Sequence, residues 1–128
     1  MLFDHVDLRV SDFPRVRPLY DALLPAMGYS RIAEDAESIC YYDPNDGDQP
    51  FFGLDLDVGH RPNGSRIALR GSSRVDVDRL AAIAKDAGAT QFEPPHVCEE
   101  YTPVYYATFF ADADGNKLEI CYRKSPGG

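Results

Sequence analysis

The feature that most constrains the fold of this 128-residue chain is an internal repeat. An alternating segment at 3–10 is followed by an amphipathic segment that ends at Gly28, and the same order returns at 65–70 and 75–87, before Gly88. Alternation with a period of two predicts strands, whereas apolar residues at helical spacing before a glycine predict capped helices. Each half is thus predicted to form a strand, a helix and then three strands.

The later strands of each half follow from shorter alternating runs. They are predicted near 31–32, 38–42, 51–58, 91–93, 105–110 and 117–122. Residues 43–48 and 94–103 are rich in turn formers and predict loops. Aligning His5 with Arg66 gives a repeat offset of 66 − 5 = 61, and aligning Asp55 with Glu119 gives 119 − 55 = 64. These four polar residues are therefore predicted to line the concave side of a curved sheet, since burying them without partners is costly.

Composition excludes several classes of protein. The hydrophobic content of 44% predicts one globular domain, and a net charge of −8 with a pI of about 4.7 disfavours a nucleic-acid partner. No apolar run approaches the ~20 residues that span a bilayer, so no membrane partner is expected. The start of the chain lacks a signal-peptide pattern, and three cysteines without paired spacing are typical of a reduced protein. We predict a cytoplasmic location.

Four motifs together are similar to a known family. They are DHVDLRVSD at 4–12, Tyr20-Asp21, Tyr105-Tyr106-Ala107 and DADGNKLE at 112–119. They resemble the vicinal oxygen chelate superfamily, which is the glyoxalase, bleomycin-resistance and extradiol-dioxygenase group. The resemblance implies an α+β fold in which two βαβββ modules form a curved mixed sheet around a cleft.

The resemblance also implies the organisation of the chain. Residues 1–128 form a single glyoxalase-like domain, with module one at about 1–60 and module two at about 64–123. A homodimer is expected, because relatives of this size are commonly dimeric and build the cleft from one chain or from two. The partner is expected to be a small-molecule ligand.

The resemblance places a metal site at the first and last strands of the modules, where His5, Asp55, Arg66 and Glu119 stand. Imidazole and carboxylates suit zinc, nickel, manganese or iron(II). Arg66 departs from the pattern, because the usual residue there is histidine and a guanidinium has no lone pair. A cation about 4 Å from a divalent ion repels it by several kcal/mol at an effective dielectric of about 20. We favour a metal-free site in which Arg66 pairs with Asp55 or Glu119, while an open site of His5, Glu119 and one more ligand stays as the alternative.

Two classes of function follow, and the sequence does not decide between them. The first is a protein that binds a small organic molecule in the cleft without chemistry, which Arg66 favours. An acidic cleft would suit a cationic ligand. The second is a divalent-metal-dependent lyase, isomerase or dioxygenase, in which His5 and Glu119 hold the metal and Glu119 is the catalytic proton shuttle.

Aromatic residues near the 94–103 loop are candidates for the ligand site. Tyr101, Tyr105 and Tyr106 each offer contact area and a polar tip, although tyrosines are also ordinary strand residues. Tyr101 and Tyr106 are predicted, with Arg66, to bind the substrate.

The remaining histidines and thiols are predicted to have no chemical role. His60 and His96 are expected on surface loops. Cys40, Cys98 and Cys121 are expected to be structural, because no motif beside them makes a nucleophile.

Overall fold

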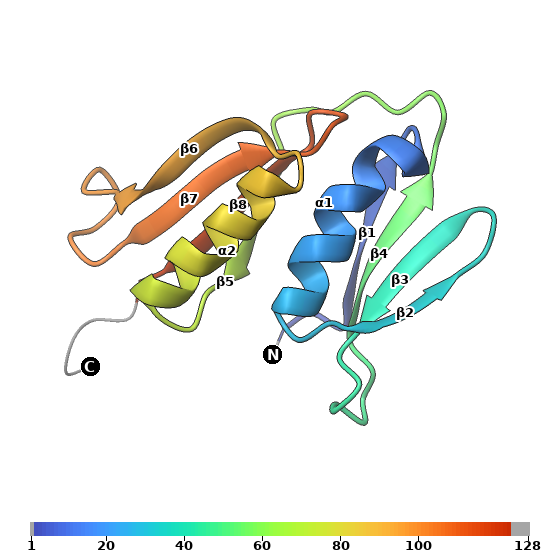
Figure 1. Ribbon diagram of the computed structural model, residues 1–128, viewed down its shortest axis with the longest axis horizontal. Helices are drawn as coiled ribbons and strands as arrows, with labels where there is room; N and C mark the ends of the chain where they lie inside the picture. The colour runs from blue at the N-terminus through green and yellow to red at the C-terminus, as the bar shows by residue number, and fades with distance from the viewer. Residues whose placement is uncertain (1, 124–128) are drawn as a thin grey trace. The chain divides into compact units, whose positions relative to one another are not determined.

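The structure is a computed structural model that describes residues 2–123, and over these residues each half of the chain builds a four-stranded sheet with one helix (Figure 1). The two compact units divide between Arg61 and Pro62, and we call them module one and module two. Module one consists of β1 (His5–Val10), α1 (Phe13–Ala26), β2 (Arg31–Glu34), β3 (Ser38–Tyr42) and β4 (Phe51–Leu56). Module two consists of β5 (Arg66–Arg70), α2 (Arg74–Asp86), β6 (Thr90–Val97), β7 (Tyr106–Ala111) and β8 (Lys117–Tyr122). The α+β class and the order of elements predicted from the sequence are confirmed.

Both sheets have the same mixed topology. The strand orders are β1-β4-β3-β2 and β5-β8-β7-β6, with β1/β4 and β5/β8 parallel and the other pairs antiparallel. A parallel pair needs a crossover connection, and in each module the helix lies within that connection. None of the helices over residues 2–123 is long and apolar enough to span a membrane.

Capping residues set the ends of the helices. The side chain of Ser73 caps α2 by accepting a hydrogen bond of 3.0 Å from the Asp76 N–H. Gly28 and Gly88 follow the two helices with φ of +94° and +103°, which glycine adopts at little cost. Apolar residues of each helix pack on one face of its sheet. The fully or nearly buried ones are Val16, Leu19, Tyr20, Leu23 and Leu24 in α1, and Val77, Leu80, Ala81 and Ala84 in α2.

Strand β6 corrects the loop predicted for 94–103. It runs from Thr90 to Val97 and includes Pro94 and Pro95. Proline is tolerated here because β6 is the edge strand, and its pairing with β7 shifts register on both sides of Glu93. The loop therefore begins at Cys98, and residue 96 belongs to the sheet.

The strand pairings also correct the repeat offset of the last strands. Val6 pairs with Phe52 in module one, and Ile67 pairs with Leu118 in module two. The first strands keep the offset 67 − 6 = 61, but the last strands have 118 − 52 = 66 rather than 64. A shift of two residues keeps every side chain on the same face, so alternation alone did not reveal the error.

This correction changes the residue that corresponds to Glu119. Its equivalent in module one is Gly53, since 119 − 66 = 53, and the equivalent of Asp55 is Cys121. Asp55 thus lies two residues beyond Gly53, which is the position in module one that corresponds to Glu119.

Candidate functional site

The sheet face that α2 leaves uncovered carries the polar strand residues of module two, and we call it the helix-free face. Strand pairing arranges these residues in rows that run across β5, β8, β7 and β6. The first row is Arg66, Lys117, Ala111 and Thr90; the middle row is Ala68, Glu119, Phe109 and Glu93; the third row is Arg70, Cys121, Ala107 and His96.

Glu119 is a nearly buried carboxylate in the middle row, with 5% of its surface exposed. The Tyr105 hydroxyl donates a hydrogen bond to it. Burial and the bond to Glu119 raise the pKa of Tyr105, so this hydroxyl stays protonated. The expected ion pair between Arg66 and Glu119 does not form among the described residues.

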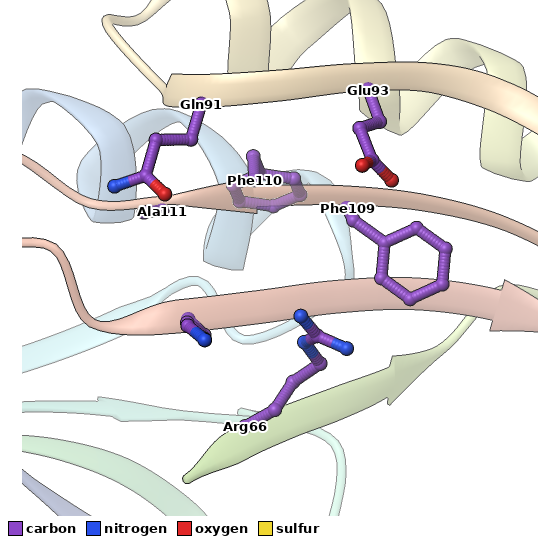
Figure 2. Close-up of a pocket in the computed structure, with 7 residues that line it drawn as sticks. Arg66, Gln91, Glu93, Phe109, Phe110 and Ala111 are labelled. Atoms are coloured by element: carbon purple, nitrogen blue, oxygen red, sulfur yellow. The ribbon is translucent and has the colours of Figure 1, made fainter. Parts of the chain in front are cut away.

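Arg66 instead lies over an aromatic ring. Its guanidinium carbon is 4.9 Å from the centre of the Phe109 ring, a cation–π distance. In Figure 2 the guanidinium reaches across from β5, while Gln91 and Glu93 extend from β6 toward the same region.

These side chains border a pocket of about 190 Å³. Its lining residues are Arg66, Gln91, Glu93, Phe109, Phe110, Ala111 and Lys117. Within residues 2–123 neither Arg66 nor Lys117 forms an ion pair, and Glu93 is the one carboxylate in the lining. Sequence reasoning missed Lys117 because its place beside Arg66 depends on the β5/β8 register.

A second cluster lies at the other end of this face. Cys98 is fully buried and packs with Ala107 and Phe109, beside Tyr105 and Cys121. Burial raises the pKa of both thiols, with further contributions from carboxylates, and neither environment activates a nucleophile.

Cys98 also lies near two other residues of metal-ligand type. The ligand atoms of His96, Cys98 and Glu100 are within 4.8 Å of one another. In the sequence these three residues follow one another at a spacing of two, which could have indicated a shared site. The spacing was not used, because residues 94–103 were predicted to be a loop.

His5 lies at the start of β1 in module one, with its ring between carboxylates. Its Nδ1 is 2.8 Å from Asp4 Oδ2, and its Nε2 is 3.5 Å from Asp7 Oδ2. The hydrogen bond to Asp4 raises the pKa of His5, with the charges of Asp7 and Asp4 adding to it. Both ring nitrogens therefore face an acceptor, and a metal at either one would have to displace a carboxylate.

The His5 ring belongs to a stack that crosses the whole sheet of module one. It lies flat on Phe51, with centroids 4.5 Å apart and 5° between planes. Phe51 contacts Tyr42 at 5.1 Å, and Arg31 lies 4.2 Å over Tyr42. Asp55 is half-buried on the same sheet, in a separate row with Arg9.

The two tyrosines predicted to bind substrate lie in different surroundings. Tyr106 donates a hydrogen bond of 2.6 Å to Asp78 of α2, and Arg74 of α2 lies 5.1 Å from its ring centre. Tyr106 is therefore on the helix-covered face, opposite Glu119. Tyr101 is 55% exposed in the loop after β6, with its ring 4.9 Å from that of Tyr105.

Comparison with known proteins finds similarity at the level of structure. No protein-family model matches the chain, and no curated protein matches its sequence. Among solved structures, a glyoxalase/bleomycin resistance protein from Albidiferax ferrireducens T118 is 26% identical, with a TM-score of 0.77 over 97% of this chain and 100% of that chain.

Two further solved structures share the fold at lower identity. The glyoxalase-related enzyme from Fulvimarina pelagi is 20% identical, with a TM-score of 0.69 over 94% of this chain and 87% of that chain. The fosfomycin resistance protein FosX from Mesorhizobium loti is 18% identical, with a TM-score of 0.67 over 95% and 92%. This chain thus has the glyoxalase-like fold, and its structural neighbours are glyoxalase/bleomycin resistance/dioxygenase family proteins, which confirms the resemblance to the vicinal oxygen chelate superfamily.

Proposed function

We propose that this protein binds a small organic molecule with an anionic group, which the first row of module two holds between Arg66 and Lys117. The observation that carries the proposal is a pocket with two cations that have no ion-pair partner among the described residues. In a chain of net charge −8, such a pocket is a local reversal of sign. It favours an anion rather than the cationic ligand that overall acidity suggested.

The chemistry of the lining supports a planar anion. A guanidinium donates two parallel hydrogen bonds to a carboxylate, and Lys117 adds a compact charge beside it. Phe109 offers an apolar surface next to the guanidinium, and Gln91 offers an amide donor and acceptor. The volume of about 190 Å³ is below the ~300 Å³ of typical ligand pockets, so it suits one end of a ligand.

The second function is a divalent-metal-dependent lyase, isomerase or dioxygenase with His5, Glu119 and Asp55 as ligands. The buried carboxylate of Glu119 favours it, because such a group suits both metal binding and proton transfer. The carboxylates at both nitrogens of His5 and the cation at position 66 weigh against it. Tyr101 remains a proposed ligand contact, and Tyr106 is set aside because it faces α2. A homodimer and a cytoplasmic location stay predictions.

The test compares benzoate with benzamide, which differ in charge but little in shape. We expect benzoate to bind at least about ten-fold more tightly, because a charge-assisted pair contributes about 1.5–3 kcal/mol. Arg66→Gln and Lys117→Gln should each remove most of this preference. Arg70→Gln, on the same strand but outside the pocket lining, is the matched control. Equal binding of the two probes, or full preference in Arg66→Gln, would overturn the proposal.

A further inference from the structure

We propose that His96, Cys98 and Glu100 form a site for a zinc-like divalent cation at the end of β6. The site shares no ligand with the set of His5, Asp55 and Glu119, and it does not rest on the proposed function of the pocket that Arg66 and Lys117 line.

The backbone around Cys98 is held on both sides. His96 pairs with Ala107 in the sheet, and the Cys98 N–H donates a hydrogen bond of 2.7 Å to the carbonyl of Tyr105. The carbonyl of Cys98 accepts bonds from the N–H groups of Tyr101 and Thr102, at 3.0 and 3.3 Å. These bonds close the loop after β6 and fix the segment that carries the three side chains.

The imidazole of His96 is oriented as a metal ligand requires. Its Nδ1 lies 2.9 Å from the carbonyl oxygen of Pro94. A carbonyl oxygen only accepts, so Nδ1 carries the proton and the neutral ring has its lone pair on Nε2. A metal-bound histidine characteristically donates its other N–H to a backbone carbonyl or carboxylate in this way.

The distances fit a tetrahedral centre. His96 Nε2 is 3.6 Å from Cys98 Sγ. Bonds of about 2.0 Å to nitrogen and 2.3 Å to sulfur at a tetrahedral angle place those two ligand atoms about 3.5 Å apart. The carboxylate of Glu100 is exposed and already within 4.8 Å of both, so rotation of its side chain completes three ligands.

The charges around the thiol favour a cation. The carboxylates of Glu100, Glu119 and Glu93 interact electrostatically with the Cys98 thiol. Their negative potential attracts a divalent ion, which would replace the thiol proton. The ion is also neutralised by the thiolate and Glu100 together.

The ligand set indicates which ion binds. One sulfur, one nitrogen and one oxygen suit zinc or cobalt(II), whereas magnesium, calcium and manganese prefer oxygen ligands. Three protein ligands leave a fourth position open, which is the arrangement of catalytic rather than structural zinc sites.

The test uses the full chain, stripped with a chelator and titrated with Zn²⁺ and Co²⁺. We expect one ion per chain, with a thiolate-to-metal charge-transfer absorption in the cobalt form. Cys98→Ser should abolish that absorption. His96→Gln and Glu100→Gln change exposed side chains and should weaken uptake by about 100-fold or more, because even loss of an outer-shell partner typically costs 10–100-fold.

Two matched variants separate this site from others. Cys121→Ser removes the other thiol of the same face, and His5→Gln removes the histidine of module one. Both should bind zinc as the unmodified chain does, and circular dichroism should confirm that every variant is folded. Absence of zinc and cobalt uptake by the unmodified chain, or unchanged uptake in folded His96→Gln, would overturn the proposal, as would a charge-transfer band that Cys121→Ser removes.

Discussion

In module one the first row of the helix-free face is filled by rings, whereas in module two the same row is a pocket with two cations. The row of module one is His5, Phe51, Tyr42 and Arg31. The row of module two is Arg66, Lys117, Ala111 and Thr90. Where Tyr42 stacks between its neighbours in module one, the equivalent Ala111 leaves room in module two. The same strand arrangement therefore carries a closed stack in one module and an open pocket in the other.

The middle rows differ in which strand of the parallel pair supplies a carboxylate. Module one has Asp7 on its first strand and Gly53 on its last, while module two has Ala68 and Glu119. A Cβ at Gly53 would lie 2.9 Å from Asp7 Oδ1, so the glycine makes room for that carboxylate. Within its pair of parallel strands, each module therefore places one acidic group beside one small residue, and the two modules use opposite strands for the acidic group.

The largest effect is expected where the modules differ at the strand-to-helix junction. Gly71 is equivalent to Val10, since 71 − 61 = 10, and a Cβ at Gly71 would be 2.7 Å from Val77 Cγ2. Gly71→Val should lower the free energy of unfolding by about 3 kcal/mol through overpacking, measured by urea denaturation. In a double-mutant cycle with Val77→Ala, we expect at least about 1 kcal/mol of compensation. Strictly additive losses would show that the two sites do not clash.

The second largest effect on stability is expected when the carboxylate of the middle row in module one is moved from β1 to β4. Gly53→Glu should cost about 2 kcal/mol, because its Cβ crowds Asp7 and its charge lies beside that carboxylate. Adding Asp7→Ala recreates the arrangement of module two and should recover at least about 1 kcal/mol in urea unfolding. If the double variant recovers no stability, the arrangement of the middle row in module two cannot replace the one in module one.

Loss of the donor to Glu119 should have an intermediate effect. Tyr105→Phe leaves a buried carboxylate with one hydrogen bond fewer, and should destabilise the fold by about 1–2 kcal/mol in thermal unfolding. Tyr101→Phe is the control, because Tyr101 is exposed in the same loop. A similar loss in both variants would show that the hydrogen bond from Tyr105 to Glu119 makes no specific contribution to stability.

The smallest expected effect is the dependence of the stability of module one on pH. The hydrogen bond to Asp4 and the charge of Asp7 raise the pKa of His5 above its ordinary value of 6.5. Charged His5 therefore stabilises module one fully below about pH 6.5, and this contribution is lost as pH rises through the raised pKa. Arg66 at the equivalent position keeps its charge throughout. NMR titration of His5 should give a pKa above 6.5, and Asp4→Asn should lower it; an unshifted value would contradict the contact.

Much of the fold was predictable because alternation and capping act locally. The strand beginning at His5 and the helix before Gly88 needed only their own side chains. Strand β6 was not predictable past Glu93, because Pro94 and Pro95 normally exclude a strand and are tolerated only at an edge. The register of the last strands needed pairing, since a two-residue shift leaves the alternation pattern unchanged.

The candidate site was predictable in part. The departure at Arg66 from histidine was visible in the sequence, and the structure places Arg66 in the lining of a pocket. Lys117 and Phe109 join Arg66 only through long-range pairing across β5, β8 and β7. The nearness of Cys98 to His96 depends on the path of β6, which proline obscured.

Chemical-shift mapping with benzoate tests the central claim most directly. With the backbone amides assigned, the account predicts that the largest shifts occur at Arg66, Gln91, Phe109 and Lys117 and are absent from Arg66→Gln. Shifts centred on the ring stack of His5, Phe51 and Tyr42, or shifts that persist in Arg66→Gln, would contradict it.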